Sequence, residues 1–149
     1  MAEMKTKSTK VSVKDFIAKV KNDTRRKDAE TLLKLFAKAT GWNAQMWGPT
    51  IVGYGRYKYT YDTGRTGEIC VVGFSPRAAN LVIYQHPDLS GKTAELLLKL
   101  GKHKGGLDSC LYINKLADVD LVVLEKLVKL GVSTLKKTAT EKNWPVSAS

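Results

Sequence analysis

Three tyrosines at alternate positions, Tyr57, Tyr59 and Tyr61, close the segment formed by residues 46–61. Side chains of a β-strand point alternately to its two faces, so the three phenols share one face and the polar residues between them share the other. A fully buried strand is usually built from Val, Ile and Leu, whereas phenol hydroxyls need hydrogen-bond partners or water. The pattern therefore predicts a sheet face that is apolar but wet at one end, where a ligand or partner can bind. The alternative is that the rings pack beneath helices with their hydroxyls at the rim.

The chain before this segment has the pattern of two helices. Ser12 followed by Asp15 resembles a capping box, and apolar residues at helical spacing follow as far as Val20. Asn22-Asp23 ends this first helix and offers a cap for a second, whose apolar stripe is stopped by Gly41.

Turn-forming residues then separate three strand-like runs, at Tyr54–Tyr61, Glu68–Phe74 and Asn80–Gln85. Because the turns between them are short, we expect an antiparallel meander, in which each strand pairs with the next.

The last part of the chain returns to helical spacing. We expect a helix over Lys92–Leu100, a short buried strand over Cys110–Ile113, and a last helix that is capped by Asp118 and stopped near Gly131. The resulting order is ααβββαβα. It predicts a two-layer α+β domain with helices on one face of a mostly antiparallel sheet.

The net charge of +11 is concentrated near the two ends of the chain. Residues 1–27 carry +6 and residues 129–149 carry +3, which leaves +2 for the rest. We interpret residues 1–11 as a disordered basic lead, residues 12–134 as a single domain and residues 135–149 as a flexible basic tail. Such termini can contact nucleic acid weakly and without reading its sequence, or they can simply aid solubility.

Membrane and secreted classes do not fit the composition. No apolar run approaches the roughly 18 residues that a membrane span needs, and no signal-peptide pattern is present at the start. The two cysteines, Cys70 and Cys110, are too few for a disulfide framework. We expect a cytoplasmic protein with reduced thiols and no membrane partner.

Two motifs resemble known sites but lack an essential part. Asp62-Thr63-Gly64 is the aspartic-protease triplet, yet that site needs two copies and this chain has one, so we interpret it as a turn. Gly101 and Gly106 have the separation of a P-loop, but Leu107-Asp108 follows in place of Lys-Ser/Thr. That loop is either a loose anion-binding nest or a solvated loop.

The sequence also lacks the residue arrangements that metal binding and covalent catalysis require. Cys70, His86, His103 and Cys110 are not paired at the spacings of metal ligands, and no residue stands out to orient His103 against Cys110. We therefore expect no metal, no other cofactor and no catalytic residues, and we favour a non-enzymatic binding role.

The predicted site is a hollow formed by the tyrosine-bearing sheet face and the Gly101–Gly106 loop. Its ligand would be a small anionic or aromatic molecule, or a partner peptide, because aromatic side chains offer stacking area and basic ones meet negative charge. The predicted ligand-binding residues are Trp47, Tyr57, Tyr59, Phe74, Arg77, Tyr84, His103, Lys104 and Tyr112.

Several blocks resemble motifs of the YdhG-like family of uncharacterised bacterial proteins. They are Trp47–Gly55, Gly73–Arg77 with Asn80, Leu81 and Tyr84, and then Leu100–Lys104, Ser109–Ile113 and Leu116–Asp120. The resemblance covers residues 12–130. It implies a compact α+β domain that is usually cytoplasmic, and some relatives are described as frataxin-like intracellular iron chaperones.

An iron-chaperone function is therefore an alternative, and a nucleic-acid-associated basic protein is another. Frataxin-type iron handling relies on clustered carboxylates, because hard cations prefer oxygen ligands. In the first two predicted helices the acidic residues are interspersed among Lys14, Lys19, Lys21, Arg25, Arg26 and Lys27. Such a surface repels cations, so we prefer the binding module.

Overall fold

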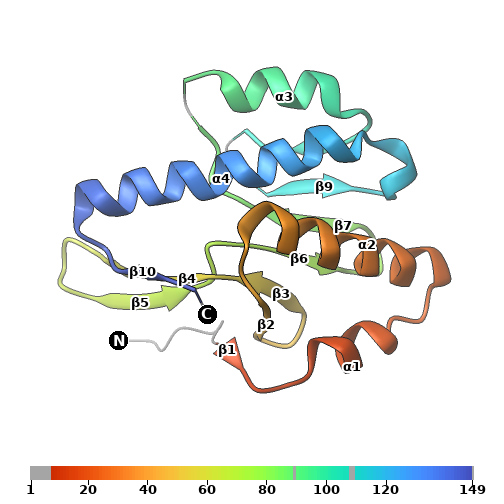
Figure 1. Cartoon of the computed structure of the whole chain (residues 1–149), viewed down its shortest axis with the longest axis horizontal. Coiled ribbons are helices and arrows are strands. Elements are labelled where there is room, and N and C mark those ends of the chain that lie inside the picture. The colour runs from red at the N-terminus through yellow and green to blue at the C-terminus, as the bar shows by residue number, and fades with distance from the viewer. Residues whose placement is uncertain (1–7, 89, 108–109, 149) are drawn as a thin grey trace.

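The computed structural model describes residues 8–88, 90–107 and 110–148 and places them in two antiparallel sheets and four helices (Figure 1). The helices are α1 (Val13–Ala18), α2 (Asp23–Thr40), α3 (Lys92–Leu100) and α4 (Leu121–Lys142), with a 3-10 turn, η1 (Leu116–Asp118). The larger sheet contains, in spatial order, β1 (Ser8–Thr9), β2 (Ala44–Trp47), β3 (Ile51–Tyr54), β6 (Val72–Pro76), β7 (Leu81–Tyr84), β9 (Leu111–Ile113) and β8 (Lys104–Gly105). The smaller sheet contains β10 (Val146–Ser147), β4 (Arg56–Thr60) and β5 (Thr66–Ile69). The predicted α+β class is confirmed.

The predicted helix starts are confirmed at both N-terminal helices. The Ser12 side chain accepts a hydrogen bond from the backbone N–H of Asp15 at 3.2 Å, which caps α1. The Asn22 side chain accepts one from the N–H of Arg25 at 2.9 Å, which caps α2. Gly41 ends α2 at a φ of 74°, a conformation that favours glycine.

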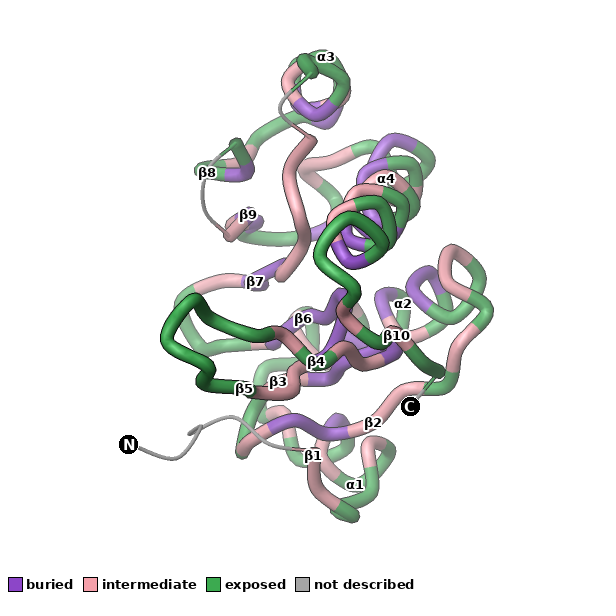
Figure 2. Tube along the Cα trace, turned by 90° about the vertical axis from the view of Figure 1, so that its left-hand side faces the viewer, coloured by how far each residue is buried: buried purple, intermediate pink, exposed green. Residues whose placement is uncertain are grey.

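Helices α2 and α4 cover one face of the larger sheet. Figure 2 shows the strands on one side and these two helices on the other, with buried segments between them. Phe36 of α2 lies at the centre of this core, with its ring 5.4 Å from that of Tyr54 and 5.3 Å from that of Phe74. The strand register places Val52, Phe74 and Ile83 side by side on this face, and all three are buried. No helix of the described residues covers the opposite face of the sheet (Figure 2).

The expected first strand, Tyr54–Tyr61, is divided between the two sheets. Its first residue ends β3 and Arg56–Thr60 form β4, because the chain bends at Gly55, where φ is 67°. A Cβ atom at Gly55 would overlap the ring of Trp42, so both the backbone and the packing require glycine there. The expected second strand, Glu68–Phe74, is divided in the same way between β5 and β6. The hairpin therefore starts in the larger sheet and continues as the smaller one.

The C-terminal region does not form the flexible tail expected for residues 135–149. Helix α4 continues through Gly131 to Lys142, because Leu135 and Ala139 repeat its buried stripe, and β10 then pairs with β4. The cap of α4 is Asp120, whose carboxylate accepts from the N–H of Val122 at 2.9 Å, and not Asp118. The domain accordingly extends beyond the expected boundary at residue 134.

The expected lead also differs in its described part. Ser8 and Thr9 pair with β2 as the edge strand β1, while residues 1–7 of that lead lie outside the described residues. Strand β2 itself had not been expected, and Trp47 ends it before a turn into β3.

Candidate functional site

Two glycines leave room above the helix-free face of the larger sheet. Gly53 and Gly73 are opposite each other in β3 and β6, and register places Trp47, Ile51 and Tyr84 on the same face. A Cβ atom at Gly53 would lie 2.5 Å from Cβ of Cys70 and would also collide with Trp47. The absence of a side chain at Gly53 therefore allows Cys70, which follows β5, to pack against the sheet. The smaller sheet then lies beside the helix-free face.

The smaller sheet and the helix-free face border a hollow of about 390 Å³, here called the Arg77 hollow. Its lining comes from the helix-free face, from the smaller sheet, from the bend between β5 and β6, and from residues just after β6, just after β7 and just before β9: Ile51, Tyr57, Ile69, Cys70, Val71, Arg77, Tyr84, Gln85, His86 and Cys110. Nη2 of Arg77 donates a hydrogen bond to the phenol oxygen of Tyr84 at 2.7 Å. The His86 ring meets that of Tyr57 edge-on, with 5.6 Å between the ring centroids.

Arg77 is the one charged group among these lining residues at neutral pH. Burial raises the pKa of Cys70 to about 12 and also raises the pKa of Cys110, so both remain thiols. Burial lowers the pKa of His86, which keeps its imidazole neutral. Burial raises the pKa of Tyr84, although the neighbouring Arg77 guanidinium acts in the opposite direction. The hollow is thus a largely apolar space lined by one cation, Arg77, and by the neutral phenols of Tyr57 and Tyr84.

A second hollow, of about 500 Å³, adjoins the first and is here called the tyrosine hollow. Its lining includes Tyr57, Tyr59 and Tyr61, so the three rings do share one face of their strand as predicted. The Trp144 ring stacks on Tyr57 at 5.9 Å and an interplanar angle of 23°. Tyr57 and Ile69 line both hollows and therefore form the wall between them.

The nine predicted ligand-binding residues do not form one site. Tyr57, Arg77 and Tyr84 line the Arg77 hollow, and Tyr59 lines the tyrosine hollow. The expectation fails for Trp47 and Phe74, whose exposures are 1% and 0%. Trp47 lies beneath the Arg56 guanidinium, which is 5.2 Å from its ring centroid, and Phe74 faces the helices.

The other three predicted residues lie at the far edge of the larger sheet. Lys104 of β8 is opposite Tyr112 of β9, and Nδ1 of His103 lies 2.8 Å from the carbonyl oxygen of Gly101. None of them lines either hollow. Among the described residues, neither hollow therefore joins His103, Lys104 or Tyr112 to the tyrosine-bearing strand as predicted.

Sequence reasoning missed His86, Cys110 and Trp144 as parts of these linings. His86 follows β7 and Trp144 follows α4, so neither position belongs to a periodic pattern that marks a face. The aromatic side chain beside Pro145 was the available signal for Trp144.

The described residues show neither a metal-binding cluster nor a membrane-spanning helix. Residues 8–88, 90–107 and 110–148 contain no group of three or more His, Cys, Asp or Glu side chains that could hold a metal ion. Within the same ranges, no helix has both the length and the apolar character that crossing a membrane requires.

A comparison of the chain with protein-family models, with curated proteins and with solved structures found no match.

Proposed function

We propose that this protein is a non-enzymatic binding module for a small organic anion with an apolar or aromatic body, and that the Arg77 hollow receives it. The observation that carries the proposal is the Arg77–Tyr84 hydrogen bond at a hollow whose other lining residues are uncharged at neutral pH. Binding sites for small molecules are typically apolar spaces with a few polar groups that fix the orientation of the ligand.

The acidic group of the ligand would bind the Arg77–Tyr84 pair. Arginine has five N–H donors in a planar fork, and the bond to Tyr84 uses one guanidinium nitrogen. Because the Tyr84 oxygen accepts from Arg77, its own O–H is available to donate onward. Its raised pKa keeps that proton in place at neutral pH. A carboxylate or phosphate oxygen can accept from both groups at once.

The body of the ligand would lie against the aliphatic and aromatic lining. Ile51, Tyr57 and Ile69 offer apolar contact area, and removing roughly 100 Å² of ligand surface from water contributes about 2.5 kcal/mol. A longer ligand would continue past the Tyr57–Ile69 wall into the tyrosine hollow, where Tyr59 and Trp144 supply aromatic surface.

Titration calorimetry with an aromatic carboxylate tests the proposal. Indole-3-acetate is a suitable probe, and indole, which lacks the carboxylate, is its uncharged control. The Arg77→Gln substitution should weaken indole-3-acetate binding about tenfold or more, because a hydrogen bond to a charged group is lost. Tyr84→Phe keeps the ring and should cost about threefold to tenfold. Neither change should alter the affinity for indole.

Arg65→Gln is the matched control, since Arg65 is an exposed arginine in the turn between β4 and β5 and lines neither hollow. Equal weakening by Arg65→Gln and Arg77→Gln would show that only net charge matters and would remove the proposed role of the pair. A thermal-shift screen of small organic acids would then identify the natural ligand class, because a ligand of the native state raises its stability. A cytoplasmic location is part of this proposal, as cysteines that do not form a disulfide suit a reducing compartment.

A further inference from the structure

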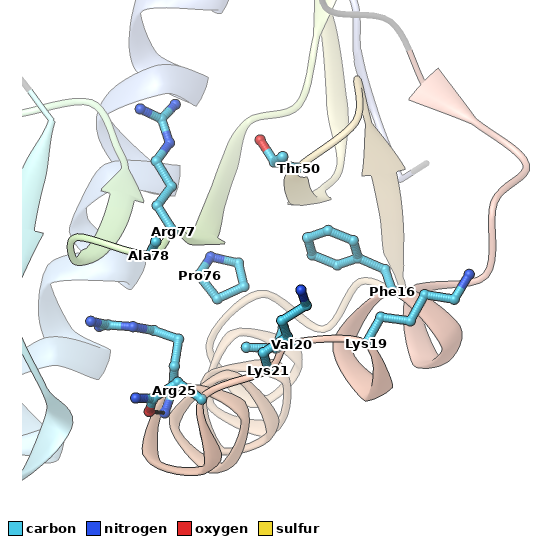
Figure 3. Close-up of a pocket in the computed structure, with 10 residues that line it drawn as sticks. Phe16, Lys19, Val20, Lys21, Arg25, Thr50, Pro76, Arg77 and Ala78 are labelled. Carbon is cyan, nitrogen blue, oxygen red and sulfur yellow. Dashed lines mark hydrogen bonds between the residues drawn. The ribbon is translucent and has the colours of Figure 1, made fainter.

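A third hollow, of about 650 Å³, lies between the α1–α2 connection and the turns at one end of the larger sheet (Figure 3). We name it the basic hollow after its four lining cations, Lys19, Lys21, Arg25 and Arg77. No carboxylate belongs to its lining. Its volume falls within the roughly 300–1,000 Å³ that is typical of small-molecule sites.

The positive charge of this hollow is not neutralised by ion pairs in the part of the chain that the structure describes. Nη1 of Arg25 donates to the backbone carbonyl of Asn114 at 2.6 Å, which holds the guanidinium without cancelling its charge. Neither Lys19 nor Lys21 forms an ion pair with a described residue. The nearest carboxylate along the chain, Asp23, is paired with Arg26 instead.

One side of the basic hollow is apolar. Phe16, Val20, Pro76 and Ala78 contribute to the lining. Figure 3 shows the Phe16 ring extending from α1 toward Pro76, with Arg25 and Arg77 on the other side of that proline. An anion alone would leave this surface without a partner, whereas an anion that carries an apolar group would cover it.

The basic hollow is separate from the Arg77 hollow, although Arg77 contributes to both linings. In Figure 3 the Arg77 side chain points away from α1 and α2, and its guanidinium donates to Tyr84 of the other hollow. Lys19, Lys21 and Arg25 line the basic hollow and not the other. Substitutions at the lysines therefore distinguish the two sites.

We infer that the basic hollow binds a small phosphorylated molecule that carries an apolar or aromatic group. A phosphate monoester has up to two negative charges and three acceptor oxygens, which suits a hollow whose lining includes several cations and no carboxylate. The first turn of α2 adds partial positive charge on the same side, because Asn22 caps that helix and also lines the hollow.

Titration calorimetry with phenyl phosphate tests this inference, with inorganic phosphate and phenol as the two half-probes. Wild-type protein should bind phenyl phosphate more tightly than either half-probe. The Lys19→Gln, Lys21→Gln double variant should bind it about tenfold more weakly. The Lys14→Gln, Lys34→Gln variant has the same net charge, and both of its sites are exposed and outside the lining, so it should bind like wild type.

Three outcomes would overturn the inference. One is equal weakening of phenyl phosphate binding in the two lysine variants, which would indicate that the overall positive charge of the protein attracts the probe. Another is loss of phenyl phosphate binding in Tyr84→Phe with retention in the Lys19, Lys21 variant, which would place the probe in the Arg77 hollow. The third is binding of a short single-stranded DNA, steeply dependent on salt, with none of phenyl phosphate, which would indicate a nucleic-acid surface. Indole-3-acetate binding by the Lys19, Lys21 variant reports on the Arg77 hollow separately, so either proposal can fail alone.

Discussion

Replacing Leu135 by alanine should destabilise the protein strongly, although residue 135 begins the segment that sequence patterns indicate as a tail. Leu135 is 2% exposed and belongs to the same core cluster as Phe36. The substitution removes three carbons from the core, at about 0.8 kcal/mol for each buried carbon. The cavity that remains adds up to about 2 kcal/mol, and the better helix propensity of alanine returns about 0.2 kcal/mol. The expected loss in the free energy of unfolding is therefore about 2–4 kcal/mol.

The assay is urea unfolding followed by circular dichroism, with Leu98→Ala as the control. Leu98 is 88% exposed on α3, so the same change of side chain should alter the free energy of unfolding by less than about 0.5 kcal/mol. The two variants share chemistry and helical context and differ in burial. If Leu135→Ala is no more destabilising than Leu98→Ala, then α4 does not pack against the core beyond Gly131.

Two further predictions concern buried polar groups. Ser75 is 0% exposed and its hydroxyl has no hydrogen-bond partner among the described residues, so Ser75→Ala should leave the free energy of unfolding unchanged or raise it by up to about 1 kcal/mol; a loss of 2 kcal/mol or more in urea unfolding would reveal an unrecognised hydrogen bond. Burial lowers the pKa of His86, so the unfolded chain binds a proton at this residue more readily than the folded chain does. The contribution of His86 to stability is therefore present above the ordinary histidine pKa. It is lost as the pH falls from that ordinary pKa to the lower pKa of the folded state. From pH 7 to about pH 5, wild-type protein should therefore lose more unfolding free energy than His86→Gln does, and parallel pH profiles of the two proteins would contradict the buried, neutral imidazole.

Local sequence signals predicted the helices whose ends are determined by capping residues or glycines close in sequence. The caps at Ser12 and Asn22 and the stop at Gly41 are side-chain or glycine effects within a few residues, and all three are found where expected. The helix at Lys92–Leu100 was predicted with its observed ends. Strands of two residues, such as β1, β8 and β10, carry no periodic signal, because two side chains cannot establish an alternation.

Glycine produced the larger differences, because its role depends on neighbours distant in sequence. Gly131 was interpreted as a helix stop, yet it lies inside α4, where a Cβ atom would come within 3.3 Å of the Gln85 side chain. The sequence pattern places Gly55 inside the single expected strand Tyr54–Tyr61, yet Gly55 turns the chain from the larger sheet into the smaller one. The same residue type therefore permits close packing at one position and a bend at the other, and only the tertiary contacts distinguish them.

The bend and the C-terminal helix together determine how open the tyrosine-bearing strand is. Alternation predicted that Tyr57, Tyr59 and Tyr61 share a face, but it contains no information on what covers each ring. Trp144 stacks on Tyr57, and burial raises the pKa of Tyr57 to about 12, whereas Tyr61 is 57% exposed at the other end of the row. Because α4 and β10 bring Trp144 to that position, the segment interpreted as a tail lines the tyrosine hollow. The tyrosine row thus runs from a half-buried ring at Tyr57 to an exposed ring at Tyr61, and the difference is set by what packs against each end of the strand.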